Sequence, residues 1–365
     1  MTQKVLTGRH GAVVPDGGAV AAHYGDPLRE QRALAERAGL VDRSDRDVLA
    51  IPGADRLTWL HDLTSQHLNA LSDGTGTEAL VLSPQGHVEH HLVLADLDGT
   101  TWADVEPGTG AALHTFLDRM RFLLRVEPAL VSDRWAVLTL AGREASAVLG
   151  SAGLPAPEPG RVVGTDGGWV RHTADLEDGV PAFDLLVARD GAAAVADALL
   201  AAGATLAGLD AFEALRVAGR RPRAGVDTDH RTIPNELSWL RTAVHLEKGC
   251  YRGQETVARV HNLGRPPRRL VLLHLDGLAE ELPAAGTPVL SGTREVGRVG
   301  TVVRHHEQGV IALALVKQSV AVDAALTVGG AAAAWVSSSP PGASSGSIAA
   351  ARERVRAVRS ATIHG

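Results

Sequence analysis

The chain has 365 residues and a mass of 38.1 kDa, which is too long for one ordinary core, so we expect two or three domains. Its net charge of −6, with no long basic run before the C-terminal end, argues against nucleic acid as a partner. The apolar stretches are too interrupted to span a membrane, the first residues lack the apolar core of a signal peptide, and one cysteine cannot form an internal disulfide; these features favour a cytoplasmic protein, which we expect to be a monomer.

The first predicted elements follow a loose N-terminal arm, which we expect over residues 1–27. Residues 28–133 are predicted to form an α+β half that opens with a helix and a strand. A second helix begins near Ala54, strands follow with turns at residues 84–86 and 98–99, and an amphipathic helix then runs into a strand. This order is typical of a split βαβ arrangement over an antiparallel sheet.

A related order recurs over residues 134–267, so we expect a second α+β half that faces the first. Over residues 268–336 the pattern changes to short strands separated by glycine turns, which predicts a small antiparallel β-barrel. Residues 337–365 are expected to be a flexible linker and a basic tail, either a short helix or a frayed end, whose arginines form a solvated face. The predicted fold class is therefore α+β with a C-terminal barrel.

The only cysteine, Cys250, lies in a segment that is unusual for a buried, inert thiol. Lys248 precedes it by two residues and Arg252 follows it by two, so the thiol is expected to lie in a positive environment that favours the thiolate. Gly249 and Gly253 allow a positive φ or a close backbone approach, which suits a tight turn that presents the sulfur. We therefore favour a functional cysteine over a structural one.

Other chemistry for this thiol finds less support in the sequence. A Cys/His/acid hydrolase is one possible use, but no spacing selects a base among the 16 histidines. A zinc or iron–sulfur site needs more thiolates than one. The pairs His90-His91 and His305-His306 could supply imidazoles, yet neighbouring residues of a strand point to opposite faces. No metal site is predicted.

The run from Lys248 to Glu255, KGCYRGQE, closely resembles the K-G-C-Y-x-G-Q-E signature of the YgfZ family. These are folate-binding proteins related to the glycine-cleavage T protein (aminomethyltransferase) and to a mitochondrial iron–sulfur assembly factor. The resemblance extends over residues 35–336. It implies an aminomethyltransferase-like ring of three domains around a tetrahydrofolate pocket, ending in a small β-barrel, which agrees with the two halves and the barrel predicted above.

The resemblance also separates two activities. In the aminomethyltransferase branch a Gly-x-x-Asp-Asp pattern carries the catalytic acid as its second aspartate, whereas the matching run here ends in His90. The Tyr-x-Gly-Glu element of the T protein is also missing from residues 171–186. These departures argue against aminomethyl transfer. The resemblance implies instead a tetrahydrofolate-dependent role in the assembly or repair of iron–sulfur enzymes, with client or assembly proteins as partners.

The resemblance also implies which residues contact folate. Asp184 aligns with the acid that binds the pterin, and Arg216 with the arginine that approaches the folate. A surface acid and a helix ion pair are the structural alternatives for these two residues. Arg223, Asp227 and Glu236 either join the folate contacts or hold the cysteine segment in place.

For the cysteine segment, the expected roles are these. Cys250 acts as a reactive thiolate or a transient ligand for iron, and Lys248 and Arg252 keep it ionised. Gln254 and Glu255 position the segment, and Tyr251 either stacks beside the folate pocket or packs in the interior.

Two other functions stay open: an aminomethyltransferase that releases ammonia from an aminomethyl-lipoyl carrier protein, and a scaffold whose cysteine is structural.

Overall fold

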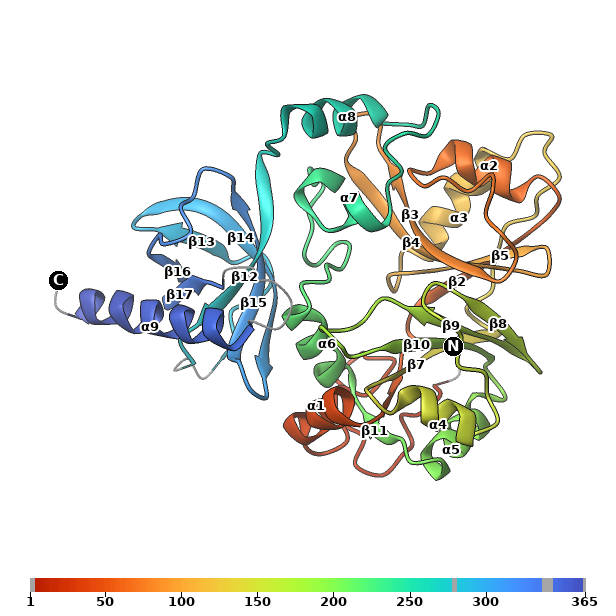
Figure 1. Ribbon diagram of the computed structural model, residues 1–365, viewed down its shortest axis with the longest axis horizontal. Helices are drawn as coiled ribbons and strands as arrows, with labels where there is room; N and C mark the ends of the chain where they lie inside the picture. Colours follow the sequence, from red (N-terminus) through yellow and green to blue (C-terminus); the bar gives the residue numbers. More distant parts are fainter. Residues whose placement is uncertain (1–3, 278–280, 337–343, 364–365) are drawn as a thin grey trace. The chain divides into compact units, whose positions relative to one another are not determined.

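The computed structural model describes residues 4–277, 281–336 and 344–363 (Figure 1). The chain divides into two compact units. Unit 1 consists of Met1–Phe212 with Trp239–Thr256, and unit 2 consists of Glu213–Ser238 with Val257–Gly365. Each unit takes two separate segments of the chain, so the division differs from the successive ranges predicted from the sequence.

Unit 1 contains two β-sheets and most of the helices. Its helices are α1 (Pro27–Glu36), α2 (Arg56–Leu63), α3 (Gly110–Arg119), α4 (Ala145–Ser151), α5 (Ala192–Ala201) and α7 (Trp239–Thr242), while α6 (Leu209–Ala218) and α8 (Gln254–Leu263) continue into unit 2. Its strands are β1 (Gly39–Asp42), β2 (Asp47–Pro52), β3 (Thr75–Leu82), β4 (Val88–Leu97), β5 (Thr100–Val105), β6 (Ala129–Leu130), β7 (Trp135–Ala141), β8 (Val162–Thr165), β9 (Gly168–Thr173), β10 (Ala182–Ala188) and β11 (Thr205–Ala207).

The two sheets of unit 1 pack against each other through one apolar cluster. One sheet has the order β3-β4-β5-β2-β6 and the other the order β11-β1-β7-β10-β9-β8. Side chains from both sheets form the shared cluster, among them Val48, Ala95, Val137, Trp169 and Leu186. Because side chains alternate along a strand, the opposite faces are free to pack on α2 and α3 and on α4 and α5, where two further clusters lie. Polar residues on the facing strands are therefore held between two sheets.

Two expectations about the N-terminal region are wrong. Strand β1 was assigned to the first half, but it pairs with β7 and β11 of the other sheet, where both of its faces are covered. The described part of the predicted loose arm is anchored: Leu6 is fully buried, and its backbone N–H donates to Asp42 Oδ2 at 3.0 Å. Val13 and His23 form an isolated bridge. Burial of apolar residues in the arm offsets the entropy that a free segment would retain.

Unit 2 contains a closed barrel, which confirms the prediction from the short strands. Its strands are β12 (Arg268–Leu275), β13 (Pro288–Ser291), β14 (Arg294–His305), β15 (Gly309–Lys317), β16 (Leu326–Val328) and β17 (Ala331–Trp335), closed in the order β12-β15-β14-β13-β16-β17. A 3₁₀ turn (Pro234–Glu236) and helix α9 (Ser344–Ile363) complete it. Valines, leucines and alanines of alternate strand positions fill the interior.

The C-terminal end forms the helix that was one of the two predicted alternatives, and not the frayed end. The predicted linker at 337–343 lies outside the described residues, and α9 packs on the outside of the barrel through Ala351 and Val355. Arg352 and Arg354 donate to the backbone carbonyls of Glu307 and Trp335, so these arginines do not form a purely solvated face. Within the described ranges, no helix is long and apolar enough to cross a membrane.

Acid is expected to destabilise unit 2 through His274 of β12, which is 7% exposed. Burial, followed by the charge of Arg352, lowers the pKa of His274 to about 4. The unfolded chain therefore binds a proton below a pH of about 6.5 that the folded barrel does not take up. We expect the free energy of unfolding to fall by about 1–2 kcal/mol between pH 7 and pH 5, with the remaining loss as pH approaches 4. Urea unfolding at the two pH values measures it, and His274→Gln should show a smaller difference than the wild type.

Candidate active site

The cysteine segment lies entirely in unit 1, between α7 and α8. Cys250 is exposed. Gly253 has a φ of +80°, and a Cβ atom on it would lie 2.5 Å from the carbonyl oxygen of Ser83. Gly86 has a φ of +81° and approaches Gly253 in return. The segment therefore contacts the β3–β4 turn backbone to backbone, as the sequence predicted for Gly253. Gly249 shows neither feature, because its φ is not positive and open space surrounds it.

The two cations beside the cysteine have other partners, which corrects the expectation that they serve the thiolate. Lys248 is 5% exposed, and its Nζ donates to the backbone carbonyls of His61, Thr64 and Gln66. Burial lowers the pKa of Lys248 to about 8. Arg252 forms an exposed ion pair with Glu89 of β4, at 3.1 Å. The charged groups of Lys248 and Arg252, which are close to Cys250 in sequence, thus bind other groups of the protein.

The remaining residues of the motif shape the segment. Tyr251 is 8% exposed, its ring lies 5.1 Å from the Nζ of Lys248, and burial raises its pKa to about 12. It is therefore a packing residue of unit 1. Gln254 Nε2 donates to the carbonyl of Lys248 at 3.3 Å. Glu255 is exposed in the first turn of α8, where a carboxylate favours the helix dipole.

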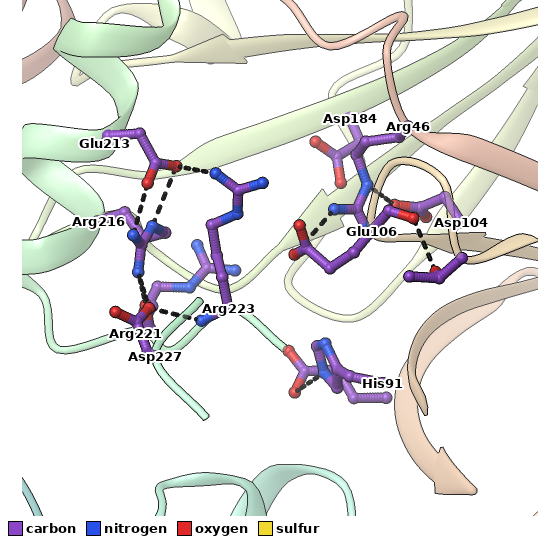
Figure 2. A network of polar contacts seen from close by, with 12 residues as sticks. Arg46, His91, Asp104, Glu106, Asp184, Glu213, Arg216, Arg221, Arg223 and Asp227 are labelled. Atoms are coloured by element: carbon purple, nitrogen blue, oxygen red, sulfur yellow. Dashed lines mark hydrogen bonds and ion pairs between the residues drawn. The ribbon is translucent and has the colours of Figure 1, made fainter. Parts of the chain in front are cut away.

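A buried network of charges joins the two sheets of unit 1, and Figure 2 shows its members Arg46, Asp104 and Asp184. Asp184 of β10 is 9% exposed and binds Thr139 Oγ1 of β7 at 2.7 Å and Arg171 Nη2 of β9 at 2.6 Å. The same Arg171 nitrogen reaches Asp104 Oδ1 of β5 at 2.8 Å. Arg46 binds Asp104 at 2.6 Å from the other side. Asp184 is therefore not the surface acid that one interpretation of the sequence allowed.

The network holds the carboxylate of Asp104 in the charged form. Burial alone would raise the pKa of Asp104, but the charges of Arg171 and Arg46 outweigh it and lower this pKa to about 2. Arg171 is 2% exposed, and its Nε and Nη1 have no hydrogen-bond partner among the described residues. Arg171, Asp104 and Arg46 were not predicted from the sequence. For Arg171 and Asp104 the available signal was a charged residue within a strand that is otherwise largely buried, whereas Arg46 lies just before β2 and had no such signal.

Strand β4 carries the histidine pair where the aminomethyltransferase pattern has carboxylates. Burial lowers the pKa of His90. The Nε2 atom of His91 lies 3.3 Å from Oε2 of Glu78. The His91 ring also stacks on Trp239, with the ring centroids 4.4 Å apart. Thr242 Oγ1 donates to the same carboxylate oxygen of Glu78 at 2.7 Å. An oriented imidazole thus lies at this place, although it is His91, and not His90, that carries the polar contacts.

The histidine pair of unit 2 differs from its expected geometry. The rings of His305 and His306 lie 4.5 Å apart, because β14 ends at His305 and His306 belongs to the following turn. In the part of the chain that the structure describes, no group of three or more His, Cys, Asp or Glu side chains is placed to hold a metal ion.

The other predicted folate contacts lie in unit 2 and bind one another. Arg216 of α6 donates through Nε and Nη2 to Glu213 and through Nη1 to Asp227 at 2.9 Å. Its remaining contacts are Thr301 Oγ1 and the carbonyl of Arg221. Arg223 pairs with Glu213 at 3.3 Å (Figure 2). Each side-chain nitrogen of Arg216 thus has a protein acceptor. This is the geometry expected if Arg216 forms a structural ion pair on a helix.

Glu236 also belongs to an internal network of unit 2. Its carboxylate binds Arg268 of β12, with Oε1 2.8 Å from Nε and Oε2 2.8 Å from Nη2. Asp229 binds the same guanidinium at 2.7 Å. These contacts fix the segment before the cysteine to the barrel within unit 2.

Two family models match the chain. The GCVT N-terminal domain matches residues 20–154, and the CAF17 C-terminal beta-barrel domain matches residues 268–341. The crystal structure of the glycine cleavage system aminomethyltransferase T from Bartonella henselae aligns with a TM-score of 0.80 at 21% identity, covering 92% of this chain and 95% of that one. The fold is therefore aminomethyltransferase-like with a small C-terminal barrel, as the sequence predicted, and the family match identifies the barrel as CAF17-type.

Curated relatives agree with these matches. A chloroplastic protein of Arabidopsis thaliana, named as a transferase, is 26% identical over 280 residues, and the chain spans 60% of its length. An aminomethyltransferase of Thermus thermophilus is 30% identical over 286 residues, which cover 76% of this chain and 78% of the relative. The chain therefore belongs to the aminomethyltransferase family.

Proposed function

We propose that this protein binds a reduced folate in unit 1 and supports the assembly or repair of iron–sulfur enzymes, with Cys250 as the thiolate that meets iron or sulfur from a partner. The observation that carries the proposal is the combination of an exposed Cys250 on an anchored segment with a histidine pair, His90 and His91, on β4. A soft thiolate suits iron and sulfur, and a single one suffices where the partner supplies the other ligands.

The folate part of the proposal assigns the pterin to Asp184. A pterin needs an acid that accepts from its amino-pyrimidine edge, and in a buried site such an acid must be held ionised. Asp184 accepts from Arg171 and Thr139, and a carboxylate has about four acceptor sites, so it retains capacity for a ligand. The GCVT match and the aminomethyltransferase relatives support a folate as that ligand.

Anaerobic calorimetric titration of the full chain with tetrahydrofolate tests this part. We expect saturable binding at one site, lost in Asp184→Asn and kept in Asp190→Asn, which changes an exposed acid just beyond β10. Thermal unfolding of each variant verifies that it is folded. A folded wild-type protein that does not bind tetrahydrofolate would overturn the folate assignment.

The iron–sulfur part is tested by Cys250→Ser. We expect this variant to bind tetrahydrofolate as the wild type does, but to fail to restore iron–sulfur enzyme activity after oxidative damage in cells that lack the protein. Full restoration would make the cysteine structural.

Aminomethyl transfer is the second candidate, because relatives at 30% identity carry that name. Two observations argue against it. Strand β4 has imidazoles where the aminomethyltransferase pattern has carboxylates, and Glu89, the residue that precedes the two histidines, pairs with Arg252. Tetrahydrofolate-dependent release of ammonia from an aminomethyl-lipoyl carrier protein would establish this activity instead.

A further inference from the structure

A lysine from a distant part of the chain binds the carbonyl groups at the C-terminal end of helix α2. An α-helix leaves its last carbonyl groups without partners inside the helix, and they need donors when they are buried. At the end of α2, the carbonyls of His61 and of the C-cap residue Thr64 accept from the Nζ of Lys248, and so does the carbonyl of Gln66 in the turn that follows; the last two distances are 2.6 and 3.0 Å. An ammonium group has three donors, which equals the number of these carbonyls. Lys248 therefore completes the C-terminus of α2.

The segment before Lys248 is joined to the same turn through its backbone. Ser65 Oγ donates to the carbonyl of Ala243 at 2.6 Å, and the N–H of His245 donates to the carbonyl of Ser65 at 3.0 Å. Gln66 Nε2 donates to the carbonyl of Thr242 at 3.1 Å. These contacts place residues 242–248 along the turn that follows α2. The ammonium group of Lys248 makes the last contact of this segment with the turn.

The far side of the cysteine is anchored independently. Gly253 lies against the carbonyl of Ser83, and Gln254 donates to the carbonyl of Lys248. Tyr251 packs inward with its ring near the Nζ of Lys248. Only residues 249–252 lie between the two anchors, and Cys250 is exposed at this point.

The ammonium group binds the carbonyl of His61, whose ring belongs to a cluster of three histidines, and Asp62 is the acid that acts on its charge. The ring of His67 lies 4.8 Å from that of His61 and 5.2 Å from that of His245. A buried ammonium in such surroundings has a desolvation cost that only well-placed acceptors offset. The three carbonyls are those acceptors, which explains a lysine here without any contact to the thiol.

We propose that Lys248 is a positioning residue: its ammonium group clamps residues 249–252 to the end of α2 and so fixes the place at which Cys250 is presented. The clamp stands on the contacts above, and only its consequence for iron or sulfur transfer rests on the proposed function. A preorganised thiolate would meet its partner without first ordering a loop.

The single cysteine allows a direct test, since a nitroxide spin label attaches to Cys250 alone in the full chain. In the wild type we expect an electron paramagnetic resonance spectrum dominated by a slow-motion component. Lys248→Met keeps much of the side-chain volume but leaves the three carbonyls without their donor, so it should add a component with nanosecond motion. The matched control is Lys317→Met, which removes an exposed lysine of β15 and should leave the spectrum unchanged.

Folding of the variants is measured by circular dichroism. If Lys248→Met does not fold, Gln66→Leu serves as the second variant, because it removes the side-chain donations to Thr77 Oγ1 and to the carbonyls of Glu78 and Thr242, and the acceptor of the His67 N–H, but keeps the backbone carbonyl that Lys248 binds. With Lys248 still in place, it should add a smaller mobile component than a label on the unfolded chain shows, and a fully mobile label would overturn the proposal. An unchanged spectrum in folded Lys248→Met, or an equal change in Lys317→Met, would overturn the proposal. Both outcomes are independent of tetrahydrofolate binding, so failure of the clamp and failure of the proposed function are distinguishable.

Discussion

Arg171→Met is expected to lower the free energy of unfolding by about 3–5 kcal/mol, because removal of one partner leaves buried charges uncompensated. Arg171 Nη2 lies 2.8 Å from Asp104 Oδ1 and 2.6 Å from Asp184 Oδ2, and the exposed fractions of the three side chains are 2%, 4% and 13%. Methionine fills much of the space of the arginine stem but supplies no charge or donor. Urea unfolding at pH 7, followed by circular dichroism, measures the loss.

The control for this prediction is Arg134→Met, which removes an arginine whose side chain is 68% exposed and which lies 4.0 Å from Asp133. Exposed pairs contribute little, so this variant should change the free energy of unfolding by less than about 0.5 kcal/mol. Equal unfolding midpoints for wild type and Arg171→Met would show that the network between the sheets is not what stabilises unit 1.

The ion pair between Arg171 and Asp104 is expected to respond to acid in a defined way. In the wild type the pKa of Asp104 is lowered to about 2, so the stability from its ion pairs is present at neutral pH and is lost as pH falls through about 4 toward 2. In Arg171→Met the carboxylate of Asp104 loses one of its two cations and takes up a proton at a higher pH. The difference between the two proteins should therefore shrink as pH decreases, which separates an electrostatic cause from a packing defect.

The barrel and the helices could be predicted from local patterns in the sequence, whereas the pairing of the strands required the three-dimensional structure. The short strands of residues 268–336 predicted the barrel because alternation and glycine turns act within a few residues. Strand β1 shows the limit. Its four residues favour any buried strand position, and only its pairing with β7 and β11, about 100 and 165 residues later, places it in its sheet.

The site shows the same division between local and distant information. The sequence located the cysteine segment and the close approach of Gly253, since both depend on residue types at that place. It assigned Lys248 to the thiol because the two are neighbours in sequence, yet the acceptors of Lys248 lie 187, 184 and 182 residues earlier. Arg171 was missed for the same reason: one charge inside a strand does not reveal the two aspartates, 67 and 13 residues away, that compensate it.

Gly253→Ala is expected to dislodge the cysteine segment from the β3–β4 turn. At a φ of +80° an alanine is strained, and its Cβ would lie 2.5 Å from the carbonyl oxygen of Ser83 and 2.8 Å from the Cα of Gly86. Backbone atoms on both sides cannot yield as a side chain would. Strain and overpacking together predict a loss of about 3 kcal/mol in the free energy of unfolding. A spin label on Cys250 should become mobile at the same time.

Gly249→Ala is the matched control, because it makes the same chemical change four residues earlier in the same segment. Nothing lies within 4 Å of a Cβ at Gly249, and its φ is not positive, so alanine fits there without strain. Restriction of the unfolded chain should leave its stability equal or raise it by up to about 1 kcal/mol. If the two variants behaved alike, general intolerance of the motif would explain the result, and the contact with the β3–β4 turn would not be what holds Cys250 in place.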